Sequence, residues 1–301
     1  MQPSLPINEV TPAPQSLHTP PPHMVMLQMA VSYWVSQCIY AAAKLGIADC
    51  LKTGEKSCDE LATLTQSHAP SLYRLLRALA SVGVFAETEP GQFALTPLAQ
   101  CLRSDVPESI RDTSIMLGGP DQYNSWGNIL HSIKTGESAF DTIYGMNVLE
   151  YFAQNPEPAE VFDRAMTSFS STEIAAVITS YDFASIRPLV DVAGGQGSML
   201  TAILKANPQM EGVLFDLSEV IERAQPQIER ESIVDRCHLV AGNFFESVPA
   251  GADAYLLKHI LHDWDDEHSI TILKNCSSAM AENGRVLVVE QVILPGKLMN
   301  L

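Results

Sequence analysis

The stretch that most constrains the fold of this chain is residues 189–216, LVDVAGGQGSMLTAILKANPQMEGVLFD. Its first four residues form an apolar run that predicts a buried parallel strand. A turn of small residues follows at 193–197, then a predicted helix at 199–204 and a second strand at 212–215 that ends on Asp216. Glycines let backbone N–H groups approach a ligand, and an acid ending the second strand accepts hydrogen bonds from ribose hydroxyls. The stretch therefore predicts a site for an adenosine-containing cofactor.

The spacing of the glycines leaves the kind of cofactor open. The dinucleotide fingerprint G-x-G-x-x-G does not occur in residues 193–198, and the pattern D-x-A-G-G-x-G is tighter, with Asp191 inside the first strand. The cofactor therefore need not be a dinucleotide. A glycine-rich turn without a ligand is the alternative, and residues beyond this stretch decide between the two.

Length and composition exclude several classes of protein. With 301 residues the chain is long enough for two domains, and its apolar runs are too short to cross a bilayer. A formal charge of −17 argues against nucleic acid as a partner, because phosphate binding requires clustered Lys and Arg. The six cysteines form no C-x-x-C pair, which favours reduced thiols and predicts no metal site. The N-terminus lacks a secretory signal, so we expect a cytoplasmic protein that does not bind membranes.

The first third of the chain predicts a tail followed by a compact helical unit. Residues 1–22 are rich in proline and polar residues and are expected to be disordered. Residues 23–45 predict a helix whose apolar face is too broad for a lone surface helix, so a partner chain or the second domain must cover it. Helices predicted at 59–64 and 72–82 precede a predicted β-hairpin over 84–96.

A helix-turn-helix followed by a hairpin predicts a winged helix over residues 23–105, a shape that often binds DNA. A DNA-binding unit would be basic, because it must neutralise phosphates. Acids outnumber bases here instead: within 57–103, Arg74, Arg77 and Arg103 stand against Asp59, Glu60, Glu87 and Glu89.

Beyond residue 105 the pattern changes twice. Residues 106–180 predict helices with irregular joins, and the stripe at Trp126, Ile129 and Ile133 is of the kind that packs in a core more often than it lines a ligand pocket. Strands and helices then alternate, which predicts a doubly wound α/β domain over residues 181–301. Its strands are expected at 189–192, 212–215, 237–241, 254–258 and 285–290.

Polar residues that follow these strands should lie on one rim, because a doubly wound sheet binds its ligand beyond the carboxyl ends of its strands. Asn243 and Phe244 follow the third strand and offer an amide and a ring to an adenine base. Lys258 ends the fourth strand, where it is either a cofactor contact or a surface charge, and His262 follows it in the run HILHDWDDE. The fifth strand ends on Glu290, a carboxylate that needs a partner. The imidazole of His262 suits proton removal near neutral pH, with a structural loop histidine as the alternative.

The residues around His262 have structural explanations. Four acids in residues 263–267 are favoured at a helix N-terminus, so we expect them to cap a helix. We expect Trp264 to be a packing anchor, His259 a buried neighbour and His268 a solvated helix residue.

Five motifs resemble those of the class I S-adenosylmethionine-dependent O-methyltransferases of the caffeic acid/hydroxyindole type. They occur in family order and spacing, over residues 24–301: DVAGGQG, VLFDL, GNFF, LLKHILHDWDDE and VVEQVILP. The resemblance implies S-adenosyl-L-methionine as cofactor. It also implies that residues 23–105 form a dimerisation domain, that residues 106–180 form a connector and acceptor pocket, and that the protein is a homodimer.

The resemblance implies roles for individual residues. His262 would be the catalytic base, and Glu290 would orient it. Phe162 and Met166 match positions that line the acceptor pocket in the family. The cofactor would contact residues at four strand ends: Ala193, Gly194, Gly195, Gly197, Asp216, Asn243, Phe244 and Lys258.

Three features depart from the family pattern. The family usually has glycine in place of Ala193, and we expect the backbone contact to survive only if φ is negative there. It often has aspartate in place of Asn243. Family members also continue past Leu301 with another helix, two strands and a second glutamate, so we expect a C-terminally incomplete domain.

The function that the sequence favours is methyl transfer from S-adenosylmethionine to a phenolic or enolic hydroxyl of a small molecule. One alternative is a relative that keeps the cofactor but performs hydroxylation or decarboxylation, and the presence of His262 counts against it. Another is a cofactor-binding protein that is not catalytic because it is truncated.

Overall fold

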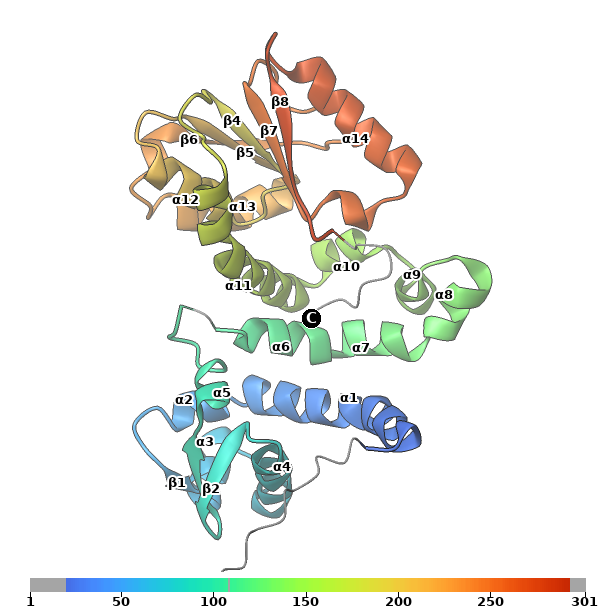
Figure 1. The fold of residues 1–301 in the computed structure, drawn as a ribbon, viewed down its shortest axis with the longest axis vertical. Helices are drawn as coiled ribbons and strands as arrows, with labels where there is room; N and C mark the ends of the chain where they lie inside the picture. The colour runs from blue at the N-terminus through green and yellow to red at the C-terminus, as the bar shows by residue number, and fades with distance from the viewer. Residues whose placement is uncertain (1–19, 108, 293–301) are drawn as a thin grey trace, which may run out of the picture.

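The structure is a computed structural model that describes residues 20–107 and 109–292 (Figure 1). The sequence predicts a disordered tail at 1–22, and residues 1–19 of it lie outside the described residues. The end of the chain, from residue 293, also lies outside them. No helix of the described part is long and apolar enough to span a membrane.

The N-terminal unit has the expected order of helices and hairpin. A capping box starts α3, because the Ser57 hydroxyl accepts from the Glu60 N–H (3.2 Å) and the Glu60 carboxylate accepts from the Ser57 N–H (2.8 Å). A short strand, β1, joins the hairpin in a sheet of order β1-β3-β2. The elements are α1 Pro22–Lys44, α2 Ile47–Cys50, β1 Lys56–Ser57, α3 Cys58–Thr65, α4 Ala69–Ser81, β2 Phe85–Glu89, β3 Gln92–Leu95 and α5 Pro97–Gln100.

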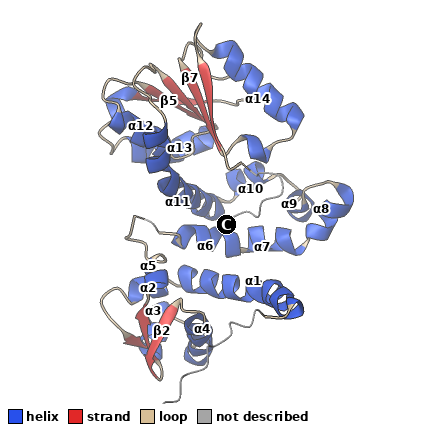
Figure 2. Cartoon of the chain, in the orientation of Figure 1, coloured by secondary structure: helices blue, strands red, loops and turns tan. Residues whose placement is uncertain are grey.

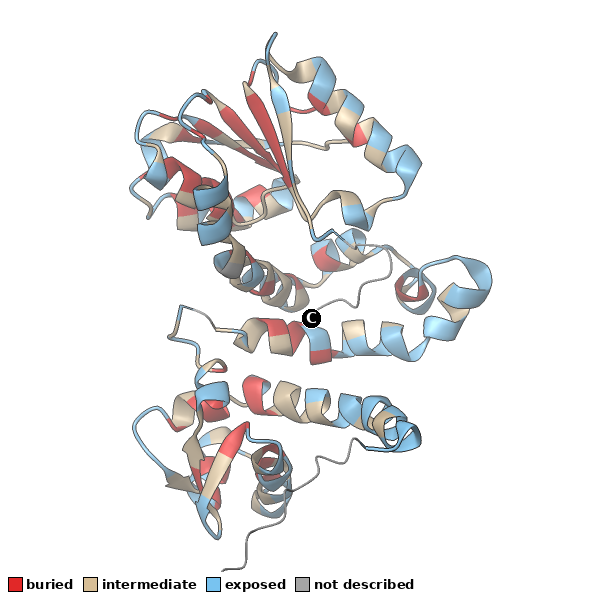
Figure 3. Cartoon of the chain, in the orientation of Figure 1, coloured by how far each residue is buried: buried red, intermediate tan, exposed pale blue. Residues whose placement is uncertain are grey.

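The broad apolar face of α1 is only partly covered by the rest of this chain. Its C-terminal half packs on α6, where Tyr40 lies against Gly118 and the Gln37 side chain donates to the Gly118 carbonyl (3.2 Å). Its N-terminal half stays open (Figure 3), with Trp34 58% exposed. Within the described residues, the helix face that the sequence predicts to need another surface is covered only in its C-terminal half.

Six helices link the two halves of the molecule (Figure 1). Trp126 and Ile133 are 65% and 76% exposed, so the prediction that their stripe packs in a core is wrong. Helical spacing shows that apolar residues share a face, but it does not show what covers that face. The helices are α6 Arg111–Gly118, α7 Pro120–Gly127, α8 Ile129–Thr135, α9 Ala139–Tyr144, α10 Val148–Gln154 and α11 Pro156–Ser180.

The second half is a five-stranded parallel sheet with helices on both faces (Figure 2). Its strand order is β6-β5-β4-β7-β8. The strands β4, β5 and β6 follow one another toward one edge, and the chain then crosses back to place β7 and β8 on the other side of β4. The fifth strand stops at Val289, one residue before Glu290. The elements are β4 Leu189–Val192, α12 Ser198–Ala206, β5 Gly212–Asp216, α13 Ser218–Ile228, β6 Cys237–Ala241, β7 Ala254–Lys258, α14 Asp266–Ala279 and β8 Arg285–Val289.

The alternating faces of the sheet build two separate cores. Leu189 and Leu214 pack with α12, α13 and the end of α11 on one face. Val190 and Tyr255 pack with α14 on the other. Because both faces are covered, β4 is buried at every position, as its apolar run predicts.

Candidate active site

The glycine turn begins directly after β4 at Ala193, whose backbone is left-handed. The Ala193 N–H donates to the Phe215 carbonyl (2.8 Å), which extends the β4–β5 pairing by one residue. Its φ is +54°, so the negative φ on which the backbone contact is expected to depend is not present. Alanine adopts the conformation that glycine would adopt, at a cost of about 1 kcal/mol or more. The turn keeps its shape, and the added methyl costs stability.

The next two glycines serve different purposes. A Cβ on Gly194 would lie 2.5 Å from a Leu214 methyl and 2.6 Å from the Asp191 carboxylate, so close packing requires glycine there. A Cβ on Gly195 would meet nothing within 4 Å, and φ is +57°. The backbone at Gly195 therefore faces open space, as a ligand-binding turn should.

Asp216 is fastened to the glycine turn. One carboxylate oxygen accepts from the Gly195 N–H (2.9 Å), and the other accepts from the Leu217 N–H (2.7 Å). Burial raises the pKa of Asp216, and these two N–H groups oppose the shift. Each oxygen keeps a second lone pair, which is what binding a ribose diol requires.

Two buried polar atoms beside the turn have no partner among the described residues. They are Oδ2 of Asp191 and Nε2 of Gln196. Burial raises the pKa of Asp191 to about 7, with Lys258 opposing the shift. An acceptor and a donor left unpaired fit a ligand that carries both an ammonium and a carboxylate, as the methionine end of S-adenosylmethionine does. The donor set at this turn therefore fits the cofactor.

At the third strand end, both predicted adenine contacts are also engaged within the fold. The Asn243 side-chain carbonyl accepts from the Phe245 N–H (2.9 Å), so its amide nitrogen is the group left to meet an adenine edge. The Phe244 ring packs edge-on against Phe245 (4.7 Å) and Trp264 (5.9 Å between centroids). Trp264 is thus the packing anchor that was expected.

His262 and Glu290 meet at the ends of β7 and β8. His262 lies in a 3₁₀ turn, Leu261–Asp263, and its Nδ1 lies 2.8 Å from Oε2 of Glu290. Burial opposes the ionisation of Glu290, but the hydrogen bond from His262 and the charges of His262 and His259 together lower its pKa. An ionised carboxylate accepts, so Nδ1 carries the proton and the Nε2 lone pair is free to take another. The His262 side chain is 53% exposed, and Nε2 lies 3.4 Å from Asp263.

The helix that follows confirms the capping explanation for three of the four acids, and Asp263 instead lies in the 3₁₀ turn beside His262. The Asp265 carboxylate accepts from the His268 N–H (2.9 Å) and caps α14. Asp266 and Glu267 occupy its first turn, where negative charge is favourable.

Glu173 is a site residue that the sequence did not reveal. Both of its carboxylate oxygens lie 2.9 Å from Nε2 of His259, and Oε2 lies 3.9 Å from the Lys258 ammonium. The two histidine contacts span 86 positions of sequence. The sequence predicts a buried neighbour, and His259 is instead half-buried. Its φ of +56° lies in the left-handed region, which is uncommon for residues other than glycine, although histidine adopts it more often than most.

Helix α11 carries Glu173 and both predicted acceptor-pocket residues. Met166 and Phe162 precede Glu173 by 7 and 11 positions, so the helical repeat places all three on one face. Phe162 and Met166 are half-buried, and the Phe162 ring lies 4.8 Å from Phe152 of α10. Because Glu173 contacts His259, this face of α11 turns toward the ends of β7 and β8.

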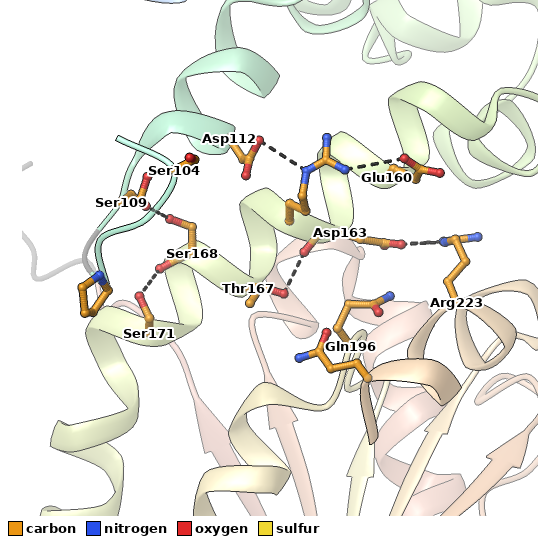
Figure 4. Close-up of a pocket in the computed structure, with 13 residues that line it drawn as sticks. Ser104, Ser109, Asp112, Glu160, Asp163, Thr167, Ser168, Ser171, Gln196 and Arg223 are labelled. Atoms are coloured by element: carbon orange, nitrogen blue, oxygen red, sulfur yellow. Dashed lines mark hydrogen bonds and ion pairs between the residues drawn. The ribbon is translucent and has the colours of Figure 1, made fainter. Parts of the chain in front are cut away.

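A polar cavity of about 490 Å³ lies between α6, α11 and α13 (Figure 4). The ion pair between Asp163 and Arg223 (2.6 Å) lines it. Gln196 joins it to the glycine turn, and none of the predicted site residues is among its described lining residues. The lining residues are Ser104, Pro107, Ser109, Asp112, Glu160, Asp163, Arg164, Thr167, Ser168, Ser171, Gln196, Arg223 and Gln227.

Comparison with known proteins identifies the protein family of this chain. Residues 126–298 match the O-methyltransferase domain family, and residues 27–105 match the O-methyltransferase dimerisation domain family. The chain belongs to this O-methyltransferase family, and its function is S-adenosylmethionine-dependent O-methylation. The family acts on small-molecule acceptors, and the matched N-terminal domain is the one through which it dimerises.

Individual members of this family resemble the chain over most of its length. The chain is 44% identical to the phenazine O-methyltransferase PhzM of Lysobacter antibioticus, over 91% of this chain and 80% of that protein. The crystal structure of LaPhzM superposes with a TM-score of 0.90 at 44% identity and covers 93% of this chain and 84% of its own. The NcsB1 O-methyltransferase of neocarzinostatin biosynthesis, solved with S-adenosylmethionine and 2-hydroxy-5-methyl naphthoic acid, gives 0.76 at 33% identity, covering 85% and 79%.

Proposed function

We propose that His262 is the general base of the methyl transfer and that Glu290 holds it in the reactive tautomer. The observation that carries this proposal is the 2.8 Å hydrogen bond between Nδ1 of His262 and Glu290 at the rim of the sheet. Because that bond commits Nδ1, the free Nε2 is the atom that removes the proton from the acceptor hydroxyl. Glu290 then stabilises the imidazolium that forms.

The remaining roles follow from position along the same rim. When bound, S-adenosylmethionine supplies an electrophilic methyl group on a positively charged sulfur. Asp216 and the backbone at 193–197 hold its ribose and methionine parts, Asn243 and Phe244 flank its adenine, and Lys258 lines the site. Much of the rate then comes from holding the acceptor oxygen in line with the methyl group.

The acceptor is a small molecule with a phenolic or enolic hydroxyl, bound against the face of α11 that carries Phe162 and Met166. Some relatives are N-methyltransferases, among them the phenazine-1-carboxylate N-methyltransferase of Pseudomonas aeruginosa. A base oriented by a carboxylate favours a hydroxyl acceptor here, because a ring nitrogen lone pair needs no deprotonation. The working unit is a homodimer in the cytoplasm that binds neither nucleic acid nor membranes.

Replacing the base tests the proposal. His262→Ala should lower turnover roughly a hundred- to ten-thousand-fold, the usual range for general acid–base catalysis. Affinity for S-adenosylhomocysteine should stay the same, because the imidazole faces the acceptor. The loss should shrink for acceptors that are already ionised at the assay pH. An equal loss on acceptors of every acidity would mean that His262 positions the substrate and does not take its proton.

A further inference from the structure

In its neutral form, the His259 ring places a nitrogen lone pair opposite a carboxylate oxygen of Glu290, and both are hydrogen-bond acceptors. Its Nε2 lies 2.9 Å from both Glu173 oxygens, so the ring proton is committed to that carboxylate. The remaining nitrogen, Nδ1, then directs its lone pair at Oε2 of Glu290, 3.5 Å away. A cation between two hydrogen-bond acceptors at that distance, either a proton on the ring or a metal ion, removes their repulsion. The other oxygen of Glu290, Oε1, is buried without a partner among the described residues.

A third ligand atom completes the group. Nδ1 of His262 lies 2.8 Å from the same Glu290 oxygen, and all three ligand atoms lie within 4.8 Å of one another. Tetrahedral zinc with bonds of about 2.0–2.1 Å separates its ligands by about 3.3 Å, so a small movement brings the three atoms into place. We propose that His259, His262 and Glu290 form a binding site for a divalent transition metal ion, best suited to Zn²⁺, and that its occupation inhibits the enzyme.

The surroundings support a cation. Metal-bound histidines usually donate their second ring nitrogen to a carboxylate, and Glu173 accepts from His259 in that way. Three carboxylates, Glu173, Asp263 and Glu290, lie beside the two rings, while Lys258 is the ammonium close to Glu173. The half-exposed His262 leaves a side open to solvent for entry and for a fourth ligand.

The inhibitory effect follows from the tautomer of His262 and rests on its proposed role as base. A metal ion on Nδ1 replaces the proton there, and the ring then carries its proton on Nε2. Nε2, which takes the proton from the substrate hydroxyl in the free enzyme, then becomes a hydrogen-bond donor. The metal-bound enzyme therefore has no base, although its cofactor site is untouched.

Metal binding itself is measured with Co²⁺ on the chelator-treated full chain. We expect one tightly bound ion with the visible absorption of a tetrahedral nitrogen and oxygen site. His259→Asn removes a ligand while keeping a residue that tolerates a left-handed backbone, and it should abolish that absorption. Glu173→Gln should weaken binding by about 10- to 100-fold, the usual effect of losing a carboxylate behind a ligand. Absence of Co²⁺ binding, an unchanged signal in His259→Asn, or a thiolate-to-cobalt band from the cysteines would overturn the proposal.

A measurement of activity tests the proposed inhibition separately from metal binding. Zn²⁺ should inhibit the wild type, and His259→Asn, measured against its own metal-free activity, should lose its sensitivity to Zn²⁺. Equal inhibition of both proteins would overturn the proposed inhibition. If neither protein were active without metal, the assignment of the reaction would fail, and the Co²⁺ titration would still decide whether the site exists.

Discussion

Asp191 should make the protein less stable as the pH rises. It is 2% exposed, one of its oxygens has no partner in the part of the chain that the structure describes, and burial raises its pKa to about 7. Between an unfolded value of about 4 and this folded value, the folded state keeps a proton that the unfolded chain has released. The unfolded state thus binds fewer protons, so the free energy of unfolding falls with increasing pH in this window.

The size of the effect follows from the shift. A difference of about three pKa units at about 1.4 kcal/mol each costs about 4 kcal/mol once the carboxylate is fully ionised. About 1.5 kcal/mol of that cost is already present at about pH 5, so about 2.5 kcal/mol develops between about pH 5 and about pH 8. Asp191→Asn has the shape of the protonated acid and cannot ionise. The variant should therefore gain about 2.5 kcal/mol on the wild type across this range.

Denaturant unfolding of both proteins at the two pH values measures this difference. Comparing the proteins at each pH removes the contribution of the other titrating groups, which they share. A difference in unfolding free energy that did not change between the two pH values would refute the reasoning. It would mean that Asp191 is ionised throughout and that its charge is compensated within the fold.

Three further outcomes are expected. Asp216→Ala should weaken binding of S-adenosylhomocysteine by about 1–3 kcal/mol, since it strands hydrogen bonds to a charged group, and unchanged calorimetric affinity would remove Asp216 from the site. Ala193→Gly should stabilise the protein by about 1 kcal/mol and the opposite change, Gly195→Ala, should destabilise it by a similar amount, because both residues have positive φ; equal melting temperatures would contradict this. The wild type should sediment as a dimer and Trp34→Glu should shift it toward monomer, whereas a folded wild-type monomer at roughly tens of micromolar would rule out the α1 interface.

The local features of this protein could be read from its sequence. The apolar run at 189–192, the glycine turn and the acid at 216 predict a strand, a turn and a second strand end, because each depends on neighbouring residues. The capping pair of Ser57 and Glu60 likewise lies within one turn of helix. Even the rim was predictable, since all carboxyl ends of a parallel sheet lie on the same edge.

Contacts across the fold were decided by the tertiary structure alone. Glu173 reaches His259 only because α11 packs against the ends of the strands, and no local pattern encodes that packing. The exposure of Trp126 has the same origin, because an apolar stripe looks the same whether a core or a partner chain covers it. The left-handed backbone of Ala193 and His259 is set by the elements on either side of each residue, which hold conformations that their own preferences disfavour. The sequence therefore determined which groups meet at the rim, and the packing of distant elements determined what surrounds them.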